Sequence, residues 1–344
     1  MLFALMAVPV CTLAEVYDLP PEGNDVVGAL TTVIARADDT LLDIARRHGL
    51  GYEDIVRANP DVDTWLPGEG TAVTLPTRYV LPHWPRNGVV LNLAEYRLYY
   101  YPTPEDGQPA VVMTYPISIG RMDWETPLGR TTIISKVRNP AWYPPASIRA
   151  EHAAEGDPLP RIVPAGPKNP LGKYAMRLGL PGYLIHGTNR PAGVGMRVTH
   201  GCIRMFPEDI DYLFGKVDVS TAVRIINEPV KMGWNGDELV VEVHRTLEVS
   251  PLPAASDEVV EPDAEELAAQ VNDEAASVEV PPVETAPPVR DAMTALTEQF
   301  VLATNEQPGE LDWEVAEQLL QLANGIPTIA GRRIKDAATS AASE

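Results

Sequence analysis

The sequence has few cysteines, few basic residues and few aromatic residues. Its 344 residues include two cysteines, Cys11 and Cys202, which are too few for a disulfide framework. Lys and Arg number 27 against 48 Asp and Glu, so the net charge of −21 leaves no basic surface to grip nucleic-acid phosphates. No Gly-rich phosphate loop, GxGxxG or HExxH motif occurs. These absences argue against a disulfide-stapled domain, a nucleic-acid-binding protein and the enzyme classes that use those motifs.

Proline and acidic residues are abundant and unevenly distributed. The 34 prolines favour strands, turns and linkers over a helical bundle, and 45% apolar residues are enough for a sizeable core. Residues 249–344 hold 19 acidic and 4 basic residues, whereas residues 1–248 hold 29 and 23. A chain of this length is expected to contain two or three units, of which the first 248 residues are only mildly acidic.

The N-terminus predicts a signal peptide over residues 1–14. Leu2–Ala14 is apolar and ends in the small-residue cleavage candidate Thr12-Leu13-Ala14, although the usual basic n-region is missing. A lipoprotein cysteine at Cys11 is the weaker interpretation, because Val10 is a poor residue before a lipidated cysteine. Cleavage at Ala14 would leave Cys202 as the single thiol. No other stretch is long and apolar enough to span a bilayer.

Residues 31–77 predict a small β-α-α-β module. Thr32-Val33-Ile34 is a short strand, Asp38-Asp39-Thr40 offers a helix N-cap, and a second helix stops before Asn59-Pro60. The stretch DDTLLDIARRHGLGYEDIVRANPDVDTWLPGEGTAVTLP resembles a LysM module over nearly its whole length. That resemblance implies binding to glycans that contain N-acetylglucosamine. The alternative is a packing domain with no ligand.

Residues 80–230 predict a mainly β domain. Val89–Leu93, Tyr96–Tyr101, Val111–Ile119, Thr131–Val137, Gly182–His186 and Ala222–Ile226 are β-branched or aromatic runs separated by turn signals. Such spacing favours a sandwich or barrel. Only Pro207–Phe214 is typical of a helix, and Pro140–Gly172 is expected to be a long irregular lid.

The remaining chain is expected to be an acidic, partly disordered and partly helical extension. Residues 231–250 are assigned to a short β extension, and residues 251–290, with seven prolines and ten acids, to a self-repelling linker. Within residues 291–344, a helical tail, two amphipathic segments surround Leu296 and Leu319. They could form a hairpin, bind a partner, or remain partly formed helices.

The chemistry is concentrated between His186 and Cys202. A strand delivers His186 at its end, and a Gly- and Pro-rich loop returns the chain to Cys202, which follows Gly201. A thiol is mostly protonated at neutral pH, so an imidazole within reach is needed to accept its proton. The N–H groups of Gly201 and Cys202 could hold an oxyanion. No acid lies near His186 in sequence, so a backbone carbonyl such as that of Gly187 could orient its ring.

These residues resemble the L,D-transpeptidase family with the YkuD catalytic domain, in its ErfK/YbiS-like branch. The motif HGT(N), a Gly-rich loop, then S/T-H-G-C-I/V-R stands here as His186–Asn189 followed by Thr199–Arg204, and VVLNLAEYRLYYYP and ISIGRMDWETPLG extend the likeness. The resemblance implies a YkuD-type β-sandwich without a metal or organic cofactor. It also implies roles for Cys202 as nucleophile, His186 as base, Gly187 as its orienting carbonyl, Gly201 and His200 in the nucleophile loop, and Arg204, Arg197 and Thr199 near the substrate.

The resemblance further implies a reaction on peptidoglycan. The family cleaves the bond between the third stem residue and a terminal D-alanine, with a thioester on the cysteine. An amine of a second stem, a lysine of an anchored lipoprotein, a free D-amino acid or water then resolves the thioester. A periplasmic location follows from this substrate together with the signal peptide.

Other interpretations remain at this point. Cys202 could be a buried structural thiol, or His186, His200 and Cys202 could bind a metal. The same thioester could be released to water, as in a carboxypeptidase or endopeptidase. A wall-binding protein whose catalytic domain has decayed would not need the intact cysteine and histidine.

Overall fold

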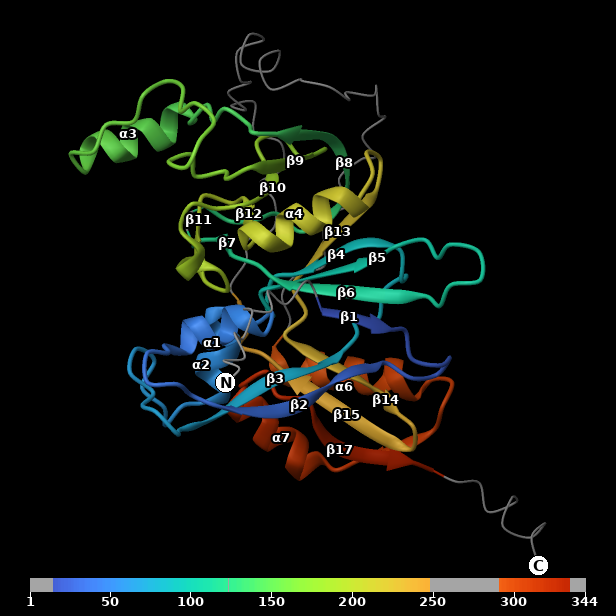
Figure 1. Ribbon diagram of the computed structural model, residues 1–344. Coiled ribbons are helices and arrows are strands. Elements are labelled where there is room, and N and C mark those ends of the chain that lie inside the picture. Colours follow the sequence, from blue (N-terminus) through green and yellow to red (C-terminus); the bar gives the residue numbers. More distant parts are fainter. Residues whose placement is uncertain (1–14, 123, 248–290, 335–344) are drawn as a thin grey trace, which may run out of the picture.

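The computed structural model describes residues 15–122, 124–247 and 291–334 (Figure 1). About 33% of the residues lie in strands and 21% in helices, so the expected mainly β class is confirmed. Three units pack against one another: a central sheet, the β-α-α-β module and a C-terminal unit. The predicted signal peptide and the predicted linker 251–290 lie outside the described residues. Within the described part of the chain, no helix is long and apolar enough to cross a membrane.

The central unit is one curled, nine-stranded sheet with the order β1-β6-β5-β4-β13-β8-β9-β10-β12. A two-stranded ladder of β7 (Ile119–Gly120) and β11 (Arg197–Thr199) lies beside it. The strands of the large sheet are β1 (Glu15–Asp18), β4 (Gly88–Asn92), β5 (Arg97–Tyr101), β6 (Val111–Pro116), β8 (Gly129–Arg138), β9 (Tyr174–Leu178), β10 (Leu184–His186), β12 (Ile203–Arg204) and β13 (Ala222–Ile226).

Both faces of the middle strands are covered. Every residue of β5 is buried, because Leu98 and Tyr100 enter one hydrophobic cluster while Tyr99 and Tyr101 enter another. The first cluster includes α4 (Pro207–Lys216), the predicted helix, and the second includes residues of the β2–β3 hairpin. Burial on both faces explains why the sequence here is a continuous aromatic run rather than an alternating one.

The β-α-α-β order expected near residues 31–77 is present. Its elements are β2 (Val26–Ile34), α1 (Leu41–Arg47), α2 (Tyr52–Ala58) and β3 (Ala72–Val80); β2 begins earlier and β3 ends later than expected. Thr40 is the N-cap of α1, where its side chain accepts from Asp43 N and Asp43 accepts from Thr40 N. The apolar helix faces pack on the strands around Leu41, Ile44 and Ile55.

The C-terminal residues differ from the expected helical tail. The two helices are present as α6 (Ala292–Thr304) and α7 (Trp313–Leu322), but they pack on this chain's own four-stranded sheet. That sheet has the order β14-β15-β17-β16 and combines β14 (Val230–Asn235) and β15 (Glu238–Val243) with β16 (Gly309–Leu311) and β17 (Thr328–Arg333). Trp234 lies in the shared core and its indole N–H donates to Ala303 O at 2.7 Å. The two expected helices are thus present, whereas the sheet that covers them was not foreseen because β15 and β17 pair across about ninety residues of sequence.

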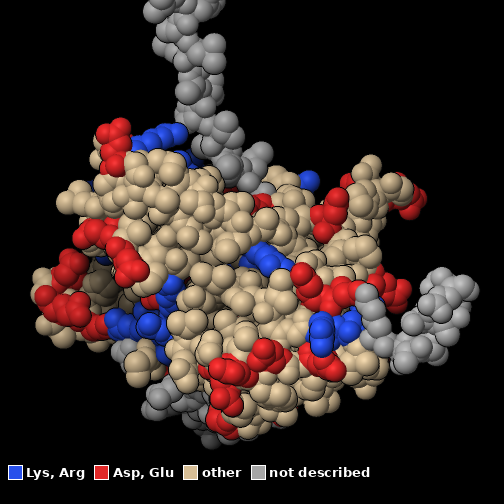
Figure 2. Space-filling view, turned by 90° about the horizontal axis from the view of Figure 1, so that it is seen from below, with Lys and Arg blue, Asp and Glu red and all other residues tan. Residues whose placement is uncertain are grey.

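The expected irregular lid contains a helix, α3 (Ala146–Ala154), at the end of the molecule opposite the C-terminal unit (Figure 1). Asn169, fully buried, ties the base of this segment by donating to Pro140 O at 2.8 Å and accepting from Leu171 N at 2.9 Å. The surface seen from below the view of Figure 1 bears several clusters of acidic side chains and only small basic patches (Figure 2).

Candidate active site

His186 ends β10 and is almost completely buried. Its Nδ1 lies 2.6 Å from Gly187 O, so Nδ1 bears the proton and donates, and Nε2 keeps a free lone pair. Burial, followed by the positive charge of Arg204, lowers the pKa of His186 to about 3. The imidazole is therefore neutral above about pH 4 and is able to accept a proton at Nε2.

Cys202 lies directly before β12, the strand that pairs in parallel with β10. The parallel register pairs Ile185 with Ile203 and His186 with Arg204, and both isoleucines point into the core. Because side chains alternate along a strand, continuing the β12 register back by one residue puts Cys202 on the same face as His186, with Cα atoms about 8 Å apart by strand spacing. The Cys202 thiol is 3.6 Å from Gly182 O, and burial raises its pKa to about 11.

The turn before Cys202 is held by two threonine hydroxyls. Gly201 has φ +93°, and a Cβ there would lie 2.8 Å from the Tyr183 ring, so only glycine fits. Thr126 donates to Gly201 O at 2.7 Å, and Thr199 donates to Cys202 O at 2.6 Å. Both threonines are buried. The hydroxyl of Thr199, which was expected near the substrate, is thus hydrogen-bonded to the backbone of the nucleophile turn.

The two expected arginines have different surroundings. Arg204 lies close enough to influence the pKa values of both His186 and Cys202, and its Nε is buried without a hydrogen-bond partner among the described residues. Arg197 makes contacts within the protein: its Nε donates to Gly120 O at 3.0 Å, and its guanidinium lies 3.8 Å from Glu125. An unpartnered buried guanidinium nitrogen needs an acceptor, which a substrate carboxylate could supply.

His200 contacts the lid helix. Its Nε2 lies 3.1 Å from Glu151 Oε2 on α3, and its ring meets Trp124 edge to face at 5.2 Å. Glu151 is also paired with Arg121, whose guanidinium lowers the pKa of that carboxyl. His200 therefore connects the nucleophile turn to α3.

Sequence reasoning missed Thr126, although it stands inside the quoted stretch ISIGRMDWETPLG. Its position immediately before a Pro-Leu-Gly turn was a local signal for an anchoring role. The contact with Gly201, 75 residues away, could not be read from spacing.

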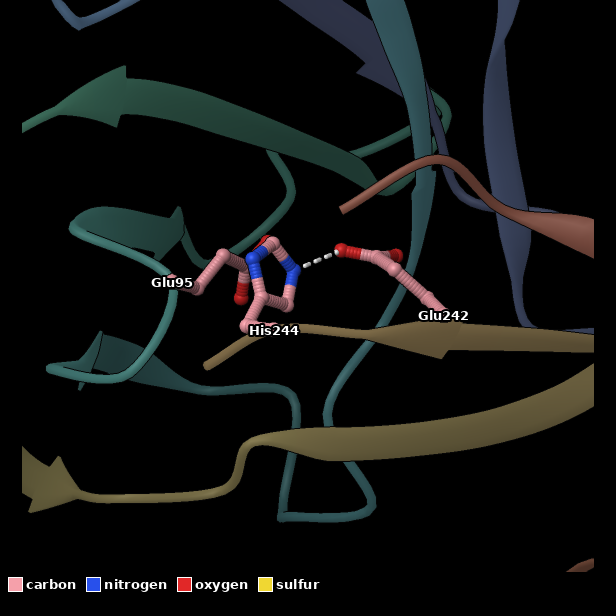
Figure 3. A group of neighbouring side chains, drawn as sticks. All are labelled: Glu95, Glu242 and His244. Carbon is pink, nitrogen blue, oxygen red and sulfur yellow. Dashed lines mark hydrogen bonds and ion pairs between the residues drawn. The ribbon is translucent and has the colours of Figure 1, made fainter. Parts of the chain in front are cut away.

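The only group of three potential metal ligands in the described part of the chain lies elsewhere. Glu95, Glu242 and His244 place one ligand atom each within 4.8 Å of one another (Figure 3). His244 Nε2 is 2.6 Å from Glu242 Oε1, but Lys231 Nζ lies 2.8 Å from Glu95 and 2.9 Å from Glu242. The ammonium group already takes the place that a cation would need, so the donor set fits an internal salt-bridge network rather than a metal centre.

Comparisons with known proteins agree with the geometry of the site. Residues 86–225 match the family model YkuD, described as the L,D-transpeptidase catalytic domain. The probable L,D-transpeptidase YcfS of Escherichia coli is 43% identical over 251 residues, 71% of this chain and 77% of its own length. YbiS of the same bacterium, also a probable L,D-transpeptidase, is 40% identical over 75% of this chain and 84% of its own length.

Among solved structures, the catalytic domain of an Enterococcus faecium L,D-transpeptidase overlaps 42% of this chain and all of its own length, with 22% identity and a TM-score of 0.31. The long matches to the curated relatives are decisive, because each is at least 40% identical and covers more than two thirds of both chains. The chain belongs to the L,D-transpeptidase family with the YkuD catalytic domain.

Proposed function

We propose that this L,D-transpeptidase acts on peptidoglycan stem peptides through a thioester on Cys202. The observation that supports this most strongly is the parallel pairing of β10, which ends at the buried His186, with β12, which begins directly after Cys202, while Gly187 O accepts from His186 Nδ1. This arrangement leaves Nε2 as the proton acceptor for an approaching thiol.

The reaction proceeds in two balanced halves. The thiol proton passes to His186 Nε2 while Sγ attacks the carbonyl carbon of the third stem residue, and the N–H groups of Gly201 and Cys202 hold the oxyanion. The imidazolium then protonates the amine of the departing D-alanine, and the acyl group remains on Cys202 as a thioester. An acceptor amine attacks this thioester, loses a proton to His186, and releases Cys202 as the thiol when that proton returns.

Arg204 is the proposed contact for a free carboxylate of the stem peptide. Its Nε is buried and has no hydrogen-bond acceptor among the described residues, and a guanidinium can bind a carboxylate through two hydrogen bonds. Arg197 and Thr199 are proposed to act from behind the site, by holding Gly120 and the Cys202 turn.

The setting of the reaction is also proposed. We infer a periplasmic protein with residues 1–14 as signal peptide, and glycan binding by the β-α-α-β module, in line with its resemblance to LysM. The acyl acceptor is a second stem peptide, with a lipoprotein lysine as the alternative amine.

Purified tetrapeptide-bearing muropeptides test the function when their products are read by mass. The intact chain should yield cross-linked dimers. If only tripeptides form, the enzyme is a hydrolase and not a transferase. Unchanged substrate would favour a wall-binding protein. Cys202→Ala should reduce turnover to background, and His186→Ala should reduce it about 10²–10⁴-fold through loss of the base. Cys11→Ala is the matched control and should retain full activity.

A carbapenem gives an independent readout of the same thiol. We expect one covalent adduct on the intact chain and on Cys11→Ala, and none on Cys202→Ala. An adduct that survives the Cys202→Ala substitution would refute the assignment of the nucleophile.

A further inference from the structure

The first turn of α2 is hydrogen-bonded to the loop that leads to Cys202. Tyr52 N donates to Val194 O at 3.0 Å, and Glu53 N donates to Gly195 O at 3.3 Å. The first N–H groups of a helix have no partner within the helix. Here two carbonyl groups of the loop between His186 and Cys202 accept from these N–H groups. Backbone groups of the module and of the loop therefore satisfy one another's hydrogen bonds.

Two glycines allow this close approach. A Cβ on Gly51 would lie 2.7 Å from Gly195 Cα, and one on Gly195 would lie 2.3 Å from Tyr52 N. Gly195 also has φ +86°, but Gly51 has φ −90° and ψ 175°, an ordinary extended conformation. At Gly51 the need for glycine therefore comes from the contact with the loop and not from the backbone angle.

Charged pairs hold the module in the same position. Asp54 Oδ2 accepts from Gly51 N at 2.9 Å and from the Arg97 guanidinium of β5 at 2.6 Å, and Arg97 is completely buried. At the end of α1, Arg46 forms two hydrogen bonds, of 2.7 and 2.8 Å, with Glu208 in the first turn of α4. These contacts fix α1 and α2 on the central unit rather than on a tether.

The held loop is continuous with the nucleophile turn. Gly193 O, just before the contact, accepts from Ser118 Oγ at 2.7 Å, and Ile119 N donates to Met196 O at 3.2 Å. The chain then enters β11, whose last residue, Thr199, donates to Cys202 O. A displacement at Gly195 would thus be transmitted over a few hydrogen-bonded residues to Cys202.

We propose that the β-α-α-β module positions the nucleophile: α2, seated through Gly51, holds the loop that fixes Cys202 beside His186. The module then contributes to turnover itself, in addition to any glycan that it binds. Gly51, Tyr52 and Glu53 act as positioning residues, since they touch the loop and not the reacting atoms. The inference rests on the proposed role of Cys202.

Gly51→Ala in the full chain tests this inference, because alanine tolerates the backbone angles of Gly51 but collides with Gly195. The matched control is Gly215→Ala in α4, where a Cβ would meet nothing within 4 Å. We expect Gly51→Ala to lower kcat and the rate of carbapenem acylation at least tenfold, with KM changed less than twofold and a native circular dichroism spectrum. Gly215→Ala should change neither rate.

Amide hydrogen exchange in the unaltered chain provides a second measurement that does not depend on a variant folding. The amides of Tyr52 and Glu53 should exchange at least tenfold more slowly than that of Leu42, which occupies the second helical position of α1 as Glu53 does in α2. Gly51→Ala should abolish this protection.

The outcomes separate the two proposals. If Cys202→Ala is inactive while Gly51→Ala turns over like Gly215→Ala, the positioning role is wrong and the proposed function stands. If Tyr52 and Glu53 exchange as fast as Leu42, the seating of α2 on the loop is wrong. Full turnover by Cys202→Ala would overturn the proposed function and with it this inference.

Discussion

Cys202 and His186 are both uncharged at rest. Burial raises the pKa of the thiol to about 11 and lowers the pKa of the imidazole to about 3, so neither group is ionised between about pH 4 and 10. A thiolate–imidazolium pair at rest would place two charges where the protein offers little solvation. In the proposed reaction, proton transfer to His186 is expected to accompany the attack of the thiol, because the developing oxyanion makes charge separation favourable.

The pH dependence of thiol alkylation checks this conclusion. In Cys11→Ala, iodoacetamide should modify Cys202 at a rate that rises about tenfold per pH unit from pH 7 to 10, because only the thiolate reacts and its fraction grows up to a pKa of about 11. The same chain in urea should level off near the ordinary thiol pKa of about 8.5. A native rate that is already flat by pH 8 would mean that the thiol ionises at rest, contrary to this account.

The strands of the central unit could be predicted from the sequence, but several other elements could not. Runs such as Val89–Leu93 and Ala222–Ile226 correspond to β4 and β13 because β-branched residues cover both faces of the sheet. The strand β9 escaped notice, and α3 lies in a segment whose prolines and glycines suggested irregular structure. The strand β17 pairs with the edge of β15, and β16 pairs in turn with β17, so both depend on a distant edge that local sequence does not encode.

The same limit applies to the candidate site. Cys202, His186 and Gly187 could be proposed from one motif, since all three stand within seventeen residues, and the structure pairs the strand that ends at His186 with the strand that follows Cys202. Thr126 and Gly51 could not, since each acts through a contact with a residue 75 or more positions away. Thr199 was placed on the substrate side because spacing does not reveal which way a hydroxyl points.

The turn between β11 and β12 should depend on the hydroxyl of Thr199. Thr199→Val keeps the shape of the side chain and its strand preference but leaves Cys202 O without its donor. We expect a loss of about 1 kcal/mol in the free energy of unfolding and a several-fold lower kcat with little change in KM. Steady-state kinetics and urea unfolding measure the two effects.

Thr199→Ser is the control for that variant, since it restores the hydroxyl on a smaller side chain. Its kcat should lie closer to that of the unaltered chain than to that of Thr199→Val. Equal losses in both variants would assign the effect to the methyl group and its packing, and the hydroxyl would have no special role at Cys202.

Across the whole molecule, buried polar groups join the three units. A cavity of about 10 Å³, enough for a single water, is lined by residues of all three, including Asp54 of the module, Arg97 of the central sheet and His244 of the C-terminal unit. Beside it, Lys231 of β14 binds Glu95 of the central unit and Glu242 of β15 (Figure 3 shows the two glutamates with His244). The units therefore share electrostatic contacts as well as apolar ones, and we expect them to unfold together.

Removal of the Lys231 ammonium should destabilise the protein most at neutral pH. Burial by itself would raise the pKa of Glu242, but Lys231 and His244 outweigh it and hold that pKa at about 2. A carboxyl with a depressed pKa adds stability above its unfolded pKa of about 4.5, and this stability is lost as the pH falls through the folded value. Lys231→Met should therefore lose about 3–5 kcal/mol at pH 7, where Glu95 and Glu242 are left without their cation.

The loss of stability in Lys231→Met should be smaller at pH 4 than at pH 7, because without the ammonium burial raises the pKa of Glu242, and the protonated carboxyl no longer needs a counter-charge. Urea unfolding at both pH values measures the difference, with the exposed Lys173→Met as control, for which a change within about 0.5 kcal/mol is expected. A deficit of the same size at pH 4 and pH 7 would show that Lys231 stabilises the junction through its packing. In that case its charge would not be what joins the central sheet to the C-terminal unit.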